Sequence, residues 1–261
     1  MPSGPTSPAN TGLGRGANLP YSDGMRLTSR DDSLLQSLDR FGQLDSGHIW
    51  DLHFSDCKSK TSWDQVAKRL MKGKYIVRMG RRMVLGDGAG SGKAVYQLGP
   101  AGWQWLNKRG LYRARFISVS EHRLKVADAF SELCKREDMG EIKIRGYYTE
   151  PDSHMQLAGV TVRPDLFVDL ELVATSEQLR LWIEIDRDKE NRPQIERKLR
   201  DYVSVYRGVT KAEMDPVPAV LFLADTEIGL TNLKNYMHGN LGEFEELIAV
   251  DHIEGFANRL S

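Results

Sequence analysis

Apolar positions in the first part of the chain recur with the spacing of amphipathic helices, in three consecutive segments. The first helix is expected to begin at Thr28 or Ser29, either of which can cap it, and to end at Gly42. A second, short helix is expected over residues 46–54, and a third over residues 61–73. The apolar face of the third helix is formed by Trp63, Val66, Ala67, Leu70 and Met71.

The pattern then changes to the short alternating runs that are typical of strands. Residues 75–78 and 83–85 are expected to form a strand pair or its beginning, and residues 94–98 to form the returning strand after a glycine-rich loop at 86–92. Another helix is expected over residues 99–106. Three helices followed by a hairpin predict a winged helix, a helix-turn-helix variant whose third helix enters the major groove of DNA. Contact with another protein is the alternative use of such a unit.

The rest of the chain alternates between helical and strand patterns. Helices are expected over residues 122–136, 191–207 and 226–238, and strands over 141–148, within 160–172, and over 179–186, 218–224 and 247–250. This order predicts a mixed sheet flanked by helices, so we expect an α+β or α/β fold.

Composition divides the chain into three parts. Residues 1–24 contain five Gly and four Pro among small polar residues, and we expect them to be a disordered tail. Residues 25–118 are expected to form the winged-helix domain. Residues 119–261 are expected to form a second domain around the mixed sheet.

The formal net charge of zero hides an asymmetry between the two halves of the chain. Residues 1–149 contain 24 Lys and Arg against 15 Asp and Glu, a net of +9, and residues 150–261 contain 12 against 21, a net of −9. A local excess of basic residues is typical of a surface that contacts nucleic acid. A solvated surface that balances the acidic half is the alternative interpretation.

The basic residues fall on the third helix and the hairpin of the predicted winged helix. Gln65 could recognise adenine there, and Lys or Arg could recognise guanine or hold phosphates. The candidate DNA-binding residues are Lys60, Gln65, Lys68, Arg69 and Lys72 on the helix and Arg78, Arg81, Arg82 and Lys93 on the wing.

Acidic residues gather at the strands of the second half. Glu184 and Asp186 are two apart in one strand and therefore share a face, and Asp165 begins the preceding strand. Three converging carboxylates would suit Mg²⁺ or Mn²⁺, which could activate water against a phosphodiester. Lys198, on the following helix, could reach them. A solvated strand end paired with nearby basic residues is the alternative.

Other features narrow the class of protein. Cys57 and Cys134 are the only cysteines, which excludes a disulfide scaffold or a four-cysteine zinc site and suits a reducing compartment. The longest strongly apolar run, residues 218–224, is too short to span a bilayer, and the chain begins without an apolar signal segment. We therefore expect a cytoplasmic protein that does not bind membranes.

Pro164-Asp165 followed by Glu184-x-Asp186 resembles the PD-(D/E)xK nuclease superfamily, and the whole combination is more similar to the replication-relaxation family of mobile elements. The similar stretches are Asp39–Leu44, Val95–Gly99, Arg163–Asp165, Trp182–Arg187 and Lys198–Tyr202. The resemblance implies an N-terminal winged helix joined to a nuclease-like domain, with Asp165 and Glu184 as metal ligands. The lysine that the superfamily has two residues after Glu184 is Asp186 here. Lys198 could replace it.

Three functions remain open at this stage. The first is a DNA-binding protein of a plasmid or mobile element, acting in replication, transfer or its regulation on double-stranded DNA. The second is an endonuclease in which Asp165, Glu184 and Asp186 hold Mg²⁺ or Mn²⁺ and Lys198 assists; without catalysis no cofactor is expected. The third is a protein-interaction adaptor. A homodimer and replication or transfer proteins are possible partners, and His122 and His154 match no ligand spacing and are interpreted as structural.

Overall fold

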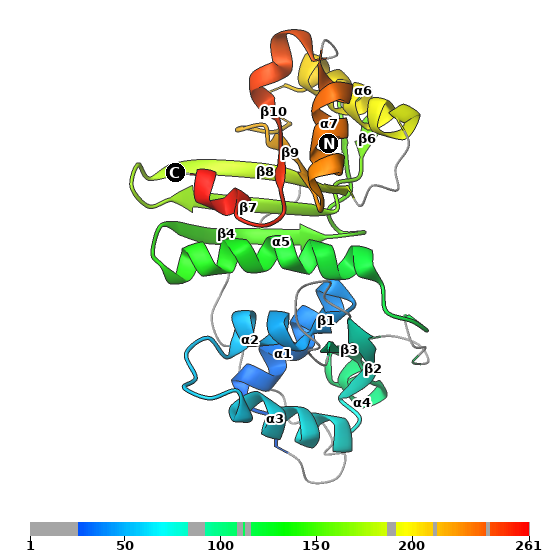
Figure 1. Ribbon diagram of the computed structural model, residues 1–261, viewed down its shortest axis with the longest axis vertical. Helices are drawn as coiled ribbons and strands as arrows, with labels where there is room; N and C mark the ends of the chain where they lie inside the picture. The colour runs from blue at the N-terminus through cyan, green and yellow to red at the C-terminus, as the bar shows by residue number, and fades with distance from the viewer. Residues whose placement is uncertain are drawn as a thin grey trace.

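A mixed five-stranded sheet lies between one long helix on one face and two helices on the other (Figure 1). The computed structural model describes residues 26–82, 92–108, 112, 116–186, 192–210, 213–238 and 241–260. The predicted disordered tail and the strand beginning at residues 83–85 therefore lie outside the described residues. The expectation of a mixed α and β fold is confirmed.

The N-terminal elements follow the predicted order of three helices and a strand pair. They are α1 (Ser29–Phe41), β1 (Leu44–Asp45), α2 (Ser46–His53), α3 (Thr61–Lys72), β2 (Ile76–Arg82), β3 (Lys93–Leu98) and α4 (Pro100–Trp105). The short β1 adds a third strand to the antiparallel pair, and the three lie side by side in the order β1-β3-β2.

Local hydrogen bonds explain where the first two helices begin. Thr28 caps α1 in a capping box, because its hydroxyl accepts from the N–H of Asp31 while the Asp31 carboxylate accepts from the N–H of Thr28. Asp45 caps α2 in the same way with His48. Both caps satisfy N–H groups that have no partner inside the helix.

The second half of the chain builds the five-stranded sheet and its helices. Its elements are α5 (Glu121–Asp138), β4 (Ile142–Thr149), β5 (Met155–Leu157), β6 (Val160–Val162), β7 (Leu166–Leu172), β8 (Glu177–Asp186), α6 (Arg192–Gly208), β9 (Ala219–Ala224), α7 (Glu227–Met237), η1 (Gly242–Leu247), β10 (Ile248–His252) and η2 (Phe256–Arg259). The strand order is β10-β9-β8-β7-β4, with β8, β9 and β10 parallel and β7 and β4 antiparallel.

The predicted strand within residues 160–172 is two strands in the structure. Only β7 joins the main sheet, whereas β6 pairs with β5 in a separate two-stranded sheet. The sequence analysis did not predict β5, because its apolar alternation extends over only three residues.

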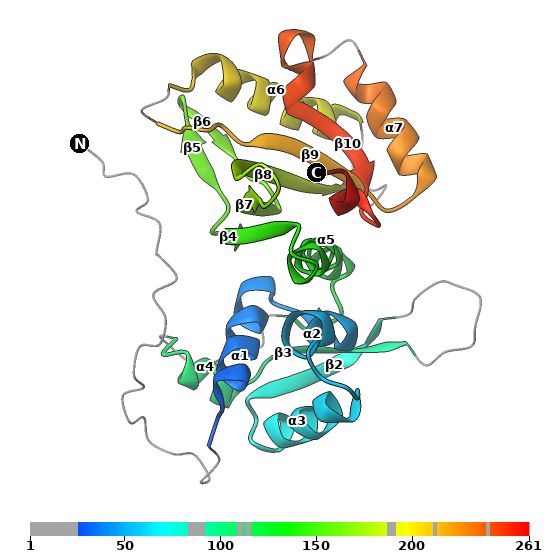
Figure 2. The same ribbon diagram turned by 90° about the vertical axis from the view of Figure 1, so that its left-hand side faces the viewer.

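Alternate residues of the central strands pack into two different cores. Ile183 and Ile185 of β8 lie in the core beneath α5, whereas Trp182 lies in the core beneath α6 and α7. The first core continues through α5 into the N-terminal elements, where it includes Leu34, Leu38 and Trp63. Figure 2 shows α5 end-on between the sheet and these elements.

The predicted boundary between residues 118 and 119 falls just before α5. Because α5 packs on both sides, this helix connects the two predicted domains. Within the described ranges, none of the helices combines the length and the apolar character of a membrane span.

Candidate functional site

The outer face of α3 is polar and basic. Trp63, Ala67 and Leu70 are buried against the N-terminal core. On the opposite side, four residues that the sequence analysis singled out are exposed: Lys60, Gln65, Lys68 and Lys72. In both views α3 lies at the end of the molecule away from the five-stranded sheet, so this face is clear of the sheet and its helices (Figures 1 and 2).

The strand pair beside α3 adds further exposed cations. Arg78 and Arg81 on β2 and Lys93 on β3 are exposed, and the Arg81 guanidinium donates to the carbonyl of Gly92 at 3.0 Å. The three side chains belong to the hairpin that the sequence analysis called the wing. Lys93 lines a pocket together with His48 and Asp51 of α2. We refer to the other exposed residues, Lys60, Gln65, Lys68, Lys72, Arg78 and Arg81, as the basic face.

Two of the candidate DNA-binding arginines form ion pairs with carboxylates of neighbouring elements. Arg69 binds both oxygens of the buried Asp31 carboxylate, at 2.6 and 2.8 Å, and so fastens α3 to α1. Arg82 is buried and lies among three carboxylates, those of Asp45, Glu121 and Asp128. Neither arginine belongs to the basic face.

The Arg82 cluster joins the hairpin to the long helix α5. Arg82 donates to both oxygens of Asp128 at 2.8 and 2.7 Å, and His48 Nε2 lies 2.7 Å from Oδ1 of the same carboxylate. Burial raises the pKa of Asp128, but the hydrogen bonds from Arg82 and His48 outweigh it and hold the pKa well below its usual range. This carboxylate therefore stays ionised and couples α2, β2 and α5.

The predicted acidic residues lie where β7 and β8 run side by side. Asp165 is buried just before β7, and its Oδ2 accepts from the backbone N–H of Ile185 at 2.8 Å. Glu184 is buried on β8, next to Ile185. Asp186 is buried at the last position of β8, opposite Ala224 of β9.

Glu184 is held by two side chains from α6. Lys198 Nζ donates to its Oε2 at 2.8 Å, and the Tyr202 hydroxyl donates to its Oε1 at 2.5 Å. Burial, and then the charge of Asp165, raise the pKa of Glu184 to about 7 despite the attraction of Lys198. The prediction that Lys198 could reach the carboxylates is confirmed for Glu184, and Tyr202 is a contact that the sequence analysis did not name.

Two further residues, His122 and Glu150, join Asp165. His122 Nε2 lies 3.0 Å from Asp165 Oδ1, and one ligand atom from each of His122, Glu150 and Asp165 lies within 4.8 Å of the others. The hydrogen bond to Asp165 raises the pKa of His122. The sequence analysis interpreted His122 and His154 as structural; the structure places His122 beside Asp165, and His154 Nε2 3.2 Å from Glu150 Oε1.

A pocket opens beside Glu184, lined by residues of α6 and of the β6 segment. Its volume is about 300 Å³, and Arg163, Arg197 and Lys198 line it together with Glu184 and Tyr202. Arg163 and Arg197 are exposed. The buried carboxylate is therefore next to a solvent-accessible space that is lined by three basic side chains and by one further acidic residue, Asp201.

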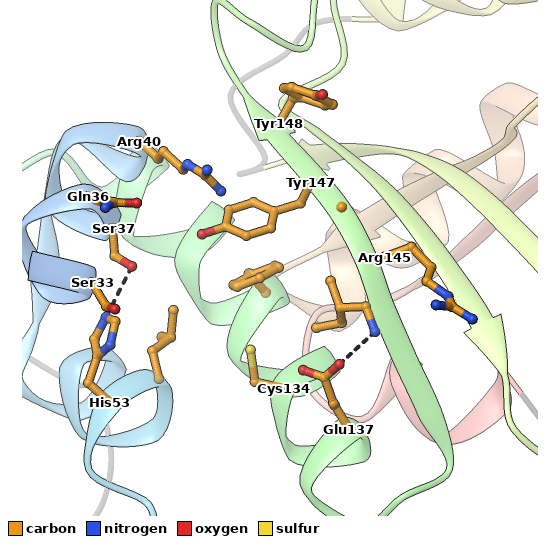
Figure 3. Close-up of a pocket in the computed structure, with 14 residues that line it drawn as sticks. Ser33, Gln36, Ser37, Arg40, His53, Cys134, Glu137, Arg145, Tyr147 and Tyr148 are labelled. Carbon is orange, nitrogen blue, oxygen red and sulfur yellow. Dashed lines mark hydrogen bonds between the residues drawn. The ribbon is translucent and has the colours of Figure 1, made fainter. Parts of the chain in front are cut away.

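A second pocket, of about 620 Å³, lies between α1, α2 and the start of the sheet (Figure 3). Tyr147 packs on Phe130 there, with a ring-centroid distance of 4.1 Å, and the Arg40 guanidinium lies over the Tyr147 ring. Burial, and then the charge of Arg30, lower the pKa of His53 to about 4. None of the predicted site residues lines this pocket.

Comparison with known proteins identifies a family for this chain. The family described as Replication-relaxation has a sequence model that matches residues 35–220, which is more than half of the chain, so the chain belongs to the replication-relaxation family. This membership connects it with the replication or transfer of plasmids and mobile elements. No curated protein and no solved structure shows significant similarity to it.

Proposed function

We propose that this chain is a DNA-binding protein of a plasmid or mobile element, in which residues 29–98 act as a winged helix on duplex DNA. The observation that carries the proposal is the basic face, because cations at helical spacing lie on the side of α3 that is not packed. An α-helix fits the major groove, and the wing contacts the adjacent backbone.

The basic face suits both parts of DNA recognition. Lys60, Lys68 and Lys72 can neutralise phosphates, which gives affinity without sequence preference. Gln65 is the side chain on the same face that could make paired hydrogen bonds with adenine. Arg69 and Arg82 act indirectly, since they fix α3 on α1 and the wing on α5.

The experiment is an equilibrium titration of fluorescent duplex DNA with the wild type and with a Lys68→Ala/Lys72→Ala variant. The matched control is Lys143→Ala/Lys234→Ala, which removes two exposed lysines from other elements, β4 and α7. We expect the first variant to bind at least about tenfold more weakly and the control to bind nearly as the wild type does. Equal weakening by both variants would indicate a diffuse charge effect and would refute a docking face on α3.

A metal-dependent endonuclease is the second candidate, and the convergence of Asp165, Glu184 and Lys198 favours it. Carboxylate oxygens are suitable ligands for Mg²⁺ or Mn²⁺, which would supply an activated water and polarise the phosphodiester. Lys198 would hold a phosphate oxygen in the adjoining pocket. In this candidate the winged helix selects the DNA site.

Supercoiled plasmid separates the two candidates. The wild type and Asp165→Ala are incubated with plasmid, with and without Mg²⁺ or Mn²⁺, and DNA binding is measured in parallel. Metal-dependent nicking that is lost in the variant would establish the endonuclease. Binding by both proteins without nicking would leave the DNA-binding function alone.

A further inference from the structure

We propose that His122, Glu150 and Asp165 form a site for a divalent first-row transition ion such as Mn²⁺, in place of the predicted set of Asp165, Glu184 and Asp186. The inference does not depend on DNA binding by α3. It names the ligands of the carboxylate site that the endonuclease candidate uses.

The three residues come from elements that meet at one end of the sheet. His122 lies in the first turn of α5, Glu150 directly follows β4, and Asp165 directly precedes β7. Because β4 and β7 are antiparallel neighbours, with Thr149 opposite Leu166, the end of one strand lies beside the start of the other. The chain therefore brings these side chains together through its main-chain pairing.

The separations fit a single ion. The ligand atoms of the cluster lie within 4.8 Å of one another, and His122 Nε2 and Asp165 Oδ1 are 3.0 Å apart. Two atoms that each lie about 2.1 Å from one metal ion can be at most about 4.2 Å apart. Only a small contraction of the side chains is needed to enclose a cation.

Hydrogen bonds determine which carboxylate oxygens face the space between His122, Glu150 and Asp165. Asp165 Oδ2 accepts from Ile185, so Oδ1 is the oxygen that faces His122. Glu184 uses one oxygen for Lys198 and the other for Tyr202. A metal ion at Glu184 would lie close to the Lys198 ammonium, which donates to one Glu184 oxygen at 2.8 Å, whereas Asp165 Oδ1 lies 3.0 Å from His122 Nε2.

Neighbouring residues orient the third ligand. His154 Nε2 lies 3.2 Å from Glu150 Oε1, and the Arg123 guanidinium lies 3.4 Å from Glu150 Oε2. Such outer contacts are typical of metal-binding carboxylates. The site is also open to ions from solution, since the His122 side chain is 33% exposed and that of Glu150 is 28% exposed.

The imidazole ligand determines the class of ion. Mg²⁺ prefers oxygen ligands and keeps several waters, whereas a site with one imidazole and two carboxylates suits Mn²⁺ and the later transition ions. The predicted set of three carboxylates suits both Mg²⁺ and Mn²⁺, and would therefore prefer Mn²⁺ less strongly. A strong preference for Mn²⁺ over Mg²⁺ therefore indicates the set that includes His122, and a weak preference indicates the set of three carboxylates.

The test is calorimetric titration of the metal-free full chain with MnCl₂ and with MgCl₂, without DNA. We expect the wild type to bind one Mn²⁺ at least about tenfold more tightly than Mg²⁺. His122→Ala is expected to lower the affinity for Mn²⁺ by at least about tenfold and to reduce the preference for Mn²⁺ over Mg²⁺. Glu150→Gln is expected to weaken Mn²⁺ binding as well. His238→Ala, which removes an exposed histidine next to α7, is the matched control and should bind as the wild type does.

Two results would overturn the proposal. One is Mn²⁺ binding that is the same in His122→Ala, Glu150→Gln and the wild type, each shown to be folded by its thermal unfolding curve. The other is loss of binding in Glu184→Gln with full binding in His122→Ala, which would restore the predicted set. Since the titration contains no DNA and measures no cleavage, its outcome is separate from that of either candidate function.

Discussion

Arg81 and Arg82 are neighbours on β2, yet only Arg81 is exposed. Removal of the buried cation would take the arginine partner from the buried Asp45 carboxylate and both guanidinium hydrogen bonds from Asp128, and loss of one partner of a buried ion pair costs about 3–5 kcal/mol. We therefore predict that Arg82→Gln lowers the free energy of unfolding by about 3 kcal/mol. Arg81→Gln is expected to change it by no more than about 0.5 kcal/mol. Urea unfolding of the two variants measures the difference, and similar losses in both would contradict the buried cluster.

His53 predicts a dependence of stability on pH. Its pKa in the folded chain is about 4, whereas its ordinary value is 6.5. Between these values the unfolded chain binds a proton that the folded chain does not, so stability falls as the pH falls from about 6.5 to about 4. The variant His53→Gln retains a polar group near Ser37 but has no titrating imidazole. Between pH 7 and pH 4.5 we expect its free energy of unfolding to decrease by about 2 kcal/mol less than that of the wild type. Parallel unfolding curves at the two pH values provide the measurement. An unchanged pH dependence in the variant would exclude His53 as its source.

At the scale of single elements, the cap of α1 connects sequence to stability most directly. The Thr28 hydroxyl accepts from Asp31, which in turn binds Arg69 of α3. Loss of a threonine cap costs about 1 kcal/mol, so Thr28→Ala is expected to lower the free energy of unfolding by about that amount. Ser33→Ala, at an exposed position within the same helix, serves as the control and should have little effect. A thermal unfolding comparison that shows no difference between them would contradict the capping assignment.

The order of the elements could be predicted from the sequence because apolar residues recur at regular spacing over the whole length of elements such as α3 and β8. The β5–β6 pair could not, since each strand has only three residues. The sequence located part of the acidic cluster. Asp165, Glu184 and Lys198 lie in or next to clear elements, whereas Glu150 is brought to Asp165 by the pairing of β4 with β7, and His122 by the packing of α5 against the sheet. A polar residue directly after a strand, as Glu150 is, was the available signal.

At the scale of the whole molecule, charge alone did not separate the cations of the basic face from those that pair with carboxylates of the fold. Arg69 and Arg82 have the same charge as Arg78 and Arg81, but tertiary contacts place them against carboxylates. The first hydrophobic core runs from the N-terminal helices through α5 to the sheet. The proposed DNA-binding face on α3 is therefore joined to the sheet that carries the acidic residues by one continuous core and by the Arg82 cluster.

The salt dependence of DNA binding tests the central claim most directly. Each phosphate that a lysine neutralises contributes a slope of about −0.9 to the logarithm of the binding constant against the logarithm of salt concentration. We predict a steep negative slope for the wild type and a slope shallower by about two to three for the Lys60→Ala/Lys68→Ala/Lys72→Ala variant. A wild-type slope near zero, or the same slope in both proteins, would contradict DNA docking through the basic face.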